Sequence, residues 1–263
     1  MSLEDFEDSE GVRSYISNSI RTHIERVRKS TIIDRTSNSE NSGFQRIGKG
    51  SLGGKGRGLA FFYTRMDQLG LGVNFPQIEF VVPNSVVIAT GIFGDFIERN
   101  KLQRFAYEEY GDDEIDQAFL EGNFGDEIEE IREMLEKTNW PIAVRSSSLL
   151  EDSSHQPFAG VYATYMLAND HPILEVRLRR LLQGIKLVYA SIFHKSAKSY
   201  ITATANKIED ERMAVVIQEV VGKETAGRFY PDISGAARSR NHYPVDPLKM
   251  EDGLAAVCIG LGR

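Results

Sequence analysis

The sequence has little cysteine and no long apolar run. Its single cysteine, Cys258, excludes an intrachain disulfide, and no C-x-x-C or His/Cys cluster has the spacing of a zinc site. No stretch reaches the roughly 18 apolar residues of a membrane-spanning helix, and the start lacks the charged and apolar regions of a signal peptide. We therefore expect a cytoplasmic protein without membrane spans. Cys258, inside the apolar run 255–259, is expected to be a core residue.

Positive charge is also scarce. The 31 basic residues are outnumbered by 38 acidic residues, which gives a formal net charge of −7. Proteins that bind nucleic acids or acidic membranes generally carry an excess of positive charge, so neither partner is expected. The 263 residues are 41% apolar and 26% charged, which is ordinary for one large or two modest globular domains. A local basic cleft for nucleotide phosphates remains compatible with these numbers.

Glycine, in contrast, is concentrated in one stretch. Residues 47–58 contain six glycines and precede an apolar segment that can begin a helix at Leu59. Glycines let backbone N–H groups approach a phosphate, a helix N-terminus adds positive potential, and Lys55 supplies a mobile charge. The stretch is not a Walker loop, because Gly56 stands where Ser or Thr should follow the lysine. The alternative interpretation is a plain flexible loop.

A second stretch, 141–148, pairs a short apolar run with an arginine. The run predicts a buried strand that ends in Arg145 and three serines, the first of which is Ser146. A guanidinium can donate two parallel N–H bonds to phosphate oxygens, so this strand end suits an anion. The alternative is an ion pair between Arg145 and Glu151 or Asp152.

Helical and strand-like segments occur throughout the chain, which predicts an α/β (α+β) fold. Residues 1–43 contain an acidic tail, an amphipathic helix over 11–29 and a polar linker. Further helices are expected over 59–69, within 84–100, before Trp140 and from Pro172 onward. Buried or half-buried strands are expected over 78–82, 141–148, 160–167, 213–221, 227–230, 236–240 and 254–259.

The order of five motifs resembles a known family. These motifs are G-G-K-G (53–56), I-E-F-V-V (78–82), A-V-R-S-S (143–147), V-V-I-Q-E-V-V (215–221) and Y-P-D-I-S-G (230–235). Together they resemble the amino-terminal nucleotide-binding part of the phosphoenolpyruvate synthase and pyruvate phosphate dikinase family, over roughly residues 45–263. The resemblance implies an ATP-grasp-like nucleotide-binding domain, incomplete at the C-terminus, with an added N-terminal helix. Its first lobe is expected over 44–212, and a truncated second lobe over 213–263.

The resemblance also implies site residues. Lys55 and Arg145 are the expected catalytic phosphate contacts, with Gly53, Gly54 and Ser146 allowing close approach. The adenine edge is assigned to the connection after the strand at 213, namely Gln218, Glu219, Val220 and Val221. Without the resemblance, these four residues would be interpreted as the exposed end of a core strand. A third phosphate ligand stays unassigned, because Ile201 occupies the position where the family often has an arginine.

The implied function is the ATP-binding part of a phosphotransferase. It would pass a phosphoryl group from Mg-ATP to a histidine on another domain, and the fragment would not be active alone. The Mg²⁺ ligands and the phosphohistidine and phosphoenolpyruvate/pyruvate domains are expected beyond residue 263, and a homo-oligomer stays open. Two alternatives remain: a non-catalytic regulatory or scaffold module of the same fold, and a different ATP-grasp phosphotransferase or ligase.

Overall fold

The computed structural model describes residues 43–66, 75–148, 160–202 and 207–261. The chain divides into two compact units at Ser42/Gly43, and all described residues belong to the second unit. The predicted helix over 11–29 therefore lies outside the described residues, as do Glu151 and Asp152. Every helix in the described ranges is too short or too polar to cross a membrane.

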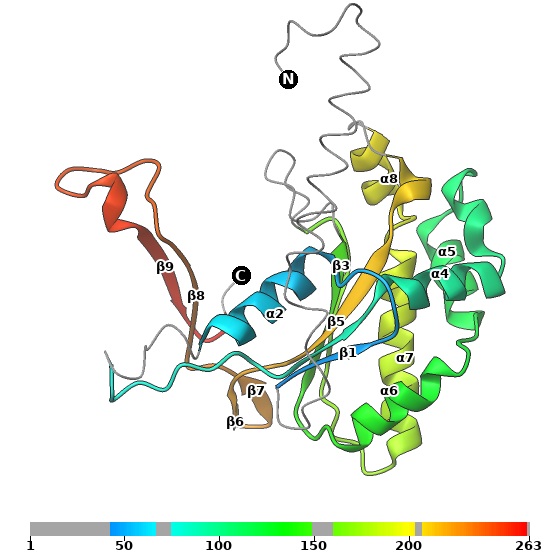
Figure 1. Cartoon of the computed structure of the whole chain (residues 1–263), viewed down its shortest axis with the longest axis horizontal. Coiled ribbons are helices and arrows are strands. Elements are labelled where there is room, and N and C mark those ends of the chain that lie inside the picture. Colours follow the sequence, from blue (N-terminus) through cyan, green and yellow to red (C-terminus); the bar gives the residue numbers. More distant parts are fainter. Residues whose placement is uncertain (1–42, 67–74, 149–159, 203–206, 262–263) are drawn as a thin grey trace, which may run out of the picture. The chain divides into compact units, whose positions relative to one another are not determined.

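A five-stranded mixed sheet forms the centre of this unit (Figure 1). Its strand order is β1-β2-β5-β3-β4, with β1 parallel to β2 and the other neighbours antiparallel. The strands are β1 (Phe44–Ile47), β2 (Ser85–Ile88), β3 (Ile142–Ser148), β4 (Thr164–Leu167) and β5 (Met213–Glu219). The expected mixed α/β fold is confirmed. The apolar start of β5 suits its position, because this strand is hydrogen-bonded on both sides.

The two faces of the sheet are covered differently. One face carries the main core and is covered by α4 (Thr90–Arg99), α5 (Asp112–Glu121), α6 (Glu127–Glu136), α7 (Leu174–Ala190) and α8 (Lys195–Thr202). The opposite face is contacted by α2 (Gly53–Met66), as Figure 1 shows. Short 3-10 helices η4 (Leu102–Ala106) and η5 (Ile208–Asp210) complete the core side. The face under α2 is therefore the less covered of the two.

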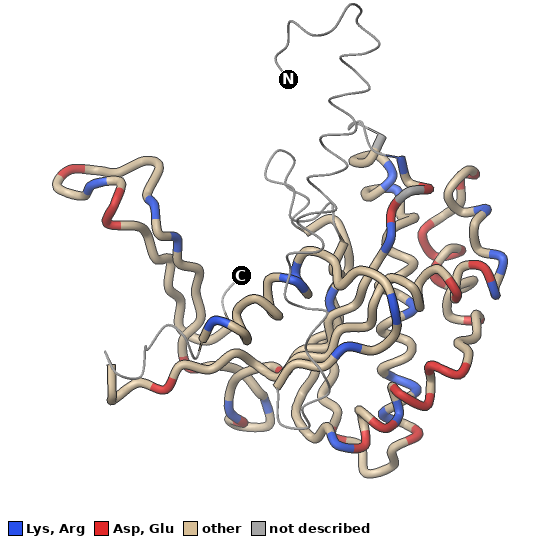
Figure 2. Tube along the Cα trace, in the orientation of Figure 1, with Lys and Arg blue, Asp and Glu red and all other residues tan. Residues whose placement is uncertain are grey.

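Helical periodicity explains which side chains enter the core. On α6, Ile131, Met134 and Leu135 are buried, whereas Glu129 and Glu133 face solvent. A spacing of three and four residues places apolar side chains on one face of a helix. Acidic residues are frequent along α5 and α6, where Figure 2 marks their positions on the trace.

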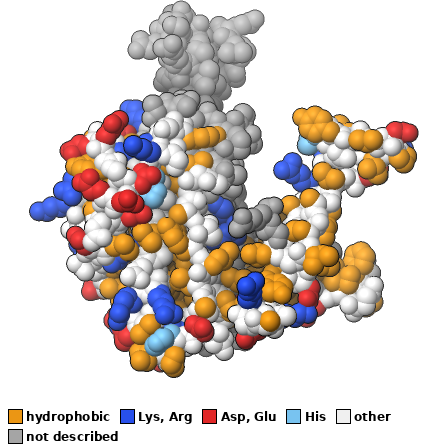
Figure 3. Space-filling model, turned by 180° about the vertical axis from the view of Figure 1, so that it is seen from behind, with side chains coloured by type: hydrophobic (Ala, Val, Ile, Leu, Met, Phe, Trp, Pro, Cys, Tyr) orange, Lys and Arg blue, Asp and Glu red, His pale blue; other side chains and the backbone are white. Residues whose placement is uncertain are grey.

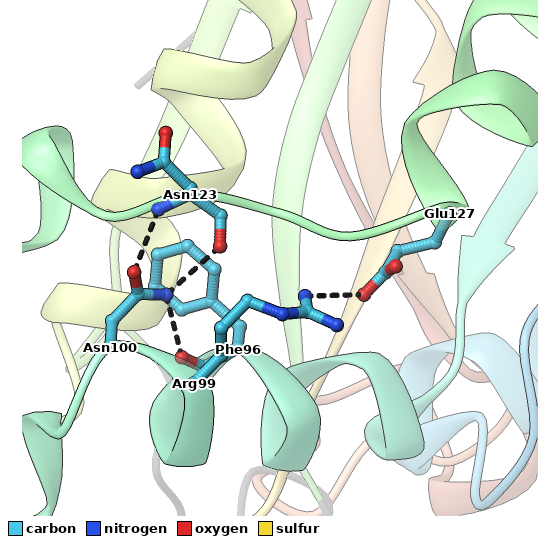
Figure 4. Close-up of polar contacts among 5 residues, drawn as sticks. All are labelled: Phe96, Arg99, Asn100, Asn123 and Glu127. Atoms are coloured by element: carbon cyan, nitrogen blue, oxygen red, sulfur yellow. Dashed lines mark hydrogen bonds and ion pairs between the residues drawn. The ribbon is translucent and has the colours of Figure 1, made fainter.

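The end of α4 is tied to the loop between α5 and α6 by one side chain. Asn100 Nδ2 donates to the Phe96 carbonyl (2.8 Å) and to the Asn123 carbonyl (3.0 Å), and Asn100 Oδ1 accepts from the Asn123 amide (2.8 Å). Arg99 reaches Glu127 at 3.3 Å beside it (Figure 4). The Phe96 carbonyl also accepts from the Asn100 backbone amide at 3.2 Å, so the Asn100 side chain supplies it with a second donor and links it to Asn123.

The predicted strand over 78–82 is wrong. Residues 78–84 form no strand, and Ile78 and Val81 are 48% and 64% exposed. The strand begins later, at Ser85, which pairs with Gln218 of β5. Because β5 ends at Glu219, the residues before Asn84 have no neighbouring strand to pair with.

Two hairpins follow β5. The first joins β6 (Lys223–Thr225) to β7 (Arg228–Tyr230), and the second joins β8 (Ile233–Arg238) to β9 (Leu254–Ile259), with the 3-10 helix η6 (Met250–Asp252) between β8 and β9. The Y-P-D-I-S-G motif (230–235) spans the end of β7 and the start of β8.

The expectation that Cys258 is a core residue is also wrong. It lies half-buried in β9, and its thiol contacts the Ser234 hydroxyl at 3.2 Å. Its apolar neighbours are exposed, including Val257 (67%) and Ile259 (94%). Figure 3 shows hydrophobic side chains on the surface of the arm that contains β8 and β9. Nothing else in the described ranges covers these two strands, so apolar composition does not place them in a core.

The boundary between lobes at 212/213 stays a prediction. β5 begins at Met213 and lies between β2 and β3 in the sheet, hydrogen-bonded to residues of the first lobe on both sides.

Candidate functional site

The candidate site begins where the glycine-rich stretch meets the sheet. α2 starts at Gly53, earlier than the expected Leu59, so the last glycines form its first turns. Gly53 has φ +67°, and a Cβ there would lie 1.7 Å from the Ser147 carbonyl oxygen. The Ser147 hydroxyl accepts from the Gly56 amide (3.0 Å) and donates to the Leu52 carbonyl (2.8 Å). Gly53 therefore lets the start of α2 lie directly against β3.

The loop before α2 is held on the side of α4. The Lys49 and Ser51 carbonyls accept from the amides of Gly91 (2.8 Å) and Thr90 (2.9 Å). The Ser51 amide donates to the Thr90 hydroxyl at 2.9 Å. These hydrogen bonds hold the loop in one conformation, which the alternative interpretation of a plain flexible loop did not anticipate.

Lys55 reaches β3. Its ammonium lies 3.1 Å from the Ser146 carbonyl oxygen and 3.5 Å from the Ser146 hydroxyl, although the two residues are 91 positions apart. Ser146 itself is buried. Arg145 directly precedes Ser146, so the fold brings Lys55 to the residue next to Arg145, in the middle of β3 and not at its end as the sequence predicted.

Arg145 lies on the sheet face that α2 contacts. Side chains alternate along a strand, and Val144 belongs to the core on the opposite face, so Arg145 and Ser147 share the α2 face. Arg145 Nη1 donates to Gln218 Oε1 at 2.9 Å. A neutral amide partner orients the guanidinium without offsetting its positive charge, whereas a carboxylate partner would offset it.

The residues assigned to the adenine edge are largely engaged within the protein. Besides accepting from Arg145, Gln218 donates to the Ser85 hydroxyl at 3.3 Å. The Glu219 carboxylate accepts from the Asn84 side-chain amide (2.6 Å), and the Glu219 amide donates to the Asn84 carbonyl (2.8 Å). The Val220 amide donates to the Pro141 carbonyl at 2.9 Å.

The amides of Glu219 and Val220 are thus engaged within the protein, and Val221 is 53% exposed. The assignment of Gln218 to Val221 to the adenine edge stays a prediction.

The region that lacks the third phosphate ligand belongs to the core. Ile201 on α8 is 2% exposed. Nearby basic side chains serve other contacts: Lys198 Nζ donates to the Glu108 carbonyl (2.6 Å), and burial lowers the pKa of Lys198. Ile201 therefore packs in the core at the position where the resembled family often has an arginine.

Two residues that shape the loop were not singled out from the sequence. Thr90 is the first residue of α4. Hydroxyl side chains are common hydrogen-bond partners near helix N-termini, so Thr90 could have been singled out from the sequence. Arg46 in β1 donates to the carbonyls of Gly48 (2.9 Å) and Gly50 (3.0 Å). An arginine in a four-residue strand gives no such signal, because it suggests only a solvent-facing position.

The described residues suit an anionic ligand such as a nucleotide. Lys55 contacts Ser146, the residue after Arg145, near the start of α2, where helix amide groups favour anions. Among the described ranges, no three His, Cys, Asp or Glu side chains gather as a metal site would require. Mg²⁺ commonly binds through one or two carboxylates together with substrate phosphates, and its ligands, expected beyond residue 263, stay a prediction.

Comparison with known proteins agrees with this geometry. The family model described as "Pyruvate phosphate dikinase, AMP/ATP-binding domain" matches residues 49–262. An uncharacterized phosphotransferase, YvkC of Bacillus subtilis (strain 168), is 29% identical over 186 residues, which cover 69% of this chain and 20% of that protein. The chain thus spans about a fifth of this relative. The chain belongs to the AMP/ATP-binding domain family of pyruvate phosphate dikinase.

Proposed function

We propose that this chain is the ATP-binding part of a phosphotransferase, with Lys55 and Arg145 as contacts to the phosphate chain. The observation that carries the proposal is the meeting of Lys55 with Ser146, directly after Arg145, at the start of α2. The family description and the phosphotransferase relative favour the same chemistry. The family description names an AMP/ATP-binding domain. The phosphate-contacting residues and the phosphoryl-transfer step are our proposal.

In the proposed mechanism the protein positions and neutralises charge. Bound ATP supplies a phosphoryl group with a good leaving group. Lys55 acts as a mobile point charge, whereas Arg145, oriented by Gln218, offers planar N–H donors to phosphate oxygens. The Gly54 amide, in the first turn of α2, adds a backbone donor. Such contacts lower the barrier to phosphoryl transfer chiefly by positioning and electrostatic stabilisation.

The finer step follows the sequence resemblance. We propose that the acceptor is a histidine on another domain: a P–O bond of the triphosphate breaks as a P–N bond forms, and the imidazole releases a proton. The phosphohistidine and phosphoenolpyruvate/pyruvate domains would be the partners. No step is assigned to Mg²⁺, because its ligands are expected beyond residue 263.

The test is calorimetric titration of the full-length protein with Mg-ATP. Lys55→Ala and Arg145→Ala are each expected to weaken binding about tenfold to a hundredfold, because a charge-assisted hydrogen bond contributes about 1.5–3 kcal/mol. Arg180→Ala is the matched control, since Arg180 lies on α7, 52% exposed and 4.0 Å from Asp170.

Unchanged affinity in both site variants would remove Lys55 and Arg145 from the phosphate site. A protein that binds ATP normally but transfers no phosphate to any of its own histidines would favour the alternative of a regulatory module.

A further inference from the structure

Four successive carbonyl groups of the glycine-rich loop each accept a hydrogen bond. The Gly48 and Gly50 carbonyls accept from Arg46 Nε (2.9 Å) and Nη2 (3.0 Å). The two carbonyls at 49 and 51 accept from the first amides of α4, at 2.8 and 2.9 Å. One guanidinium and one helix start therefore hold alternate peptide groups of the loop.

Fixing these carbonyls also fixes the amides. In a planar trans peptide, the carbonyl of one residue and the N–H of the next point in opposite directions. Arg46, by holding the Gly50 carbonyl, therefore directs the Ser51 amide away from itself. That amide donates to the Thr90 hydroxyl at 2.9 Å, so the same peptide group is held at both ends. The Gly48 carbonyl sets the direction of the Lys49 amide in the same way.

The loop needs such support because of its composition. Gly48 and Gly50 have φ values of +78° and +108°, and a Cβ on Gly50 would lie 2.6 Å from the Thr90 hydroxyl. Glycine permits this backbone, but it also loses more conformational freedom on ordering than any other residue. Bonds that hold the carbonyls in place offset this loss before a ligand binds.

We infer that Arg46 is a positioning residue for phosphate binding: it holds the loop so that the start of α2 and Lys55 lie correctly, without touching the nucleotide. This inference rests on the proposed function. It assigns Arg46 a role distinct from that of Lys55 and Arg145, the proposed direct contacts.

The experiment compares Arg46→Ala and Arg46→Lys with the full-length wild-type protein. Hydrogen exchange of peptides covering 47–55 reports the loop, and calorimetry reports the affinity for ATP and for adenosine. Arg46→Ala is expected to speed exchange in the loop and weaken ATP binding about tenfold while leaving adenosine unchanged. Arg46→Lys should recover only part of the affinity, because a compact ammonium cannot reach the Gly48 and Gly50 carbonyls together as the guanidinium does.

Arg104→Ala is the control, because Arg104 stacks on Phe105 in η4, outside the loop, and should change neither measurement. Unchanged exchange in Arg46→Ala overturns the inference, even if ATP binding weakens, because Arg46 would then be a direct ligand. Faster exchange with unchanged ATP affinity, or an equal loss for adenosine, also overturns it. A wild-type protein that fails to bind ATP contradicts the proposed function itself, which separates the two failures.

Discussion

Gly53 is held to glycine by the strand beneath it. Its φ is positive, and a Cβ at this position would lie 1.7 Å from the Ser147 carbonyl oxygen, which leaves no room for a side chain. Gly53→Ala is therefore expected to lower the free energy of unfolding by more than about 2 kcal/mol. Urea denaturation measures the loss.

Gly58 provides the matched control in the same helix. A Cβ on Gly58 meets nothing within 4 Å, so Gly58→Ala should raise the free energy of unfolding by about 0.5–1 kcal/mol through higher helix propensity. Equal effects of the two substitutions would contradict the close packing of α2 on β3.

Tyr63 predicts a specific pH dependence. Its hydroxyl donates to the carbonyls of Val82 (3.0 Å) and Pro83. Burial, with a smaller effect of the Glu219 charge, raises the pKa of Tyr63 from 10.0 to about 12, whereas a hydrogen bond with Ser85 acts in the opposite direction. The folded state thus keeps this proton to higher pH than the unfolded state. Its contribution to stability is complete below pH 10 and is lost between pH 10 and about 12.

Denaturation of wild-type protein and Tyr63→Phe across this pH range tests the assignment. The variant should lose less stability than the wild type between pH 10 and 12. Burial lowers the pKa of Lys186, which has the opposite influence on stability, but both proteins share that group. Parallel curves would exclude Tyr63 as the cause.

The stability of the C-terminal end of α4 depends on the side-chain hydrogen bonds of Asn100. Asn100→Ala removes two hydrogen bonds to the Asn123 backbone and one to the Phe96 carbonyl, as Figure 4 shows. We expect a loss of about 1–3 kcal/mol in the free energy of unfolding, because carbonyl and amide partners lose their contacts.

The neighbouring substitution Arg99→Ala is the control. Its ion pair with Glu127 has a 44% exposed arginine, and such surface pairs contribute less than about 1 kcal/mol. A larger loss for Arg99→Ala than for Asn100→Ala in thermal or urea denaturation would show that charge, not the amide network, stabilises this end of α4.

The strands and helices with regular periodicity were predicted well from the sequence, whereas the connections were not. β3, β5 and α7 lie where the apolar pattern placed them, because burial of one face imposes a period on the residues. The apolar run 78–82 carries an equally strong local pattern but lies beyond the end of its partner strand β5. Pairing with a distant strand, which a local pattern does not encode, decided the outcome.

Across the described unit, isoleucines in different strands are expected to contribute differently to the free energy of unfolding. Ile217 in β5 is fully buried, whereas Ile259 in β9 is 94% exposed. Ile217→Ala is expected to lower the free energy of unfolding by about 2–5 kcal/mol through lost burial and a cavity. Ile259→Ala should change it by less than about 0.5 kcal/mol. Urea denaturation of both variants of this chain gives the comparison, and equal losses would show that β9 is packed in solution.

Part of the candidate site could be predicted from the sequence, because its signals are local. Glycine spacing, an arginine in an apolar strand and a lysine among the glycines each report the chemistry available within a few residues. They indicated Lys55 and Arg145 as candidates, and the order of the motifs indicated the family. They did not indicate Arg46, because its contacts depend on how the loop turns back over β1.

The sequence by itself determined the mixed α/β class, the family and the chemical character of the candidate residues, since composition and periodicity act over short distances. Only the tertiary structure decided that Lys55 meets Ser146 across 91 positions and that Gln218 bonds to Arg145. It also decided that the apolar strand β9 stays exposed. Contacts of this kind arise from strand order and from the cover each face receives, and these depend on all the packed elements together.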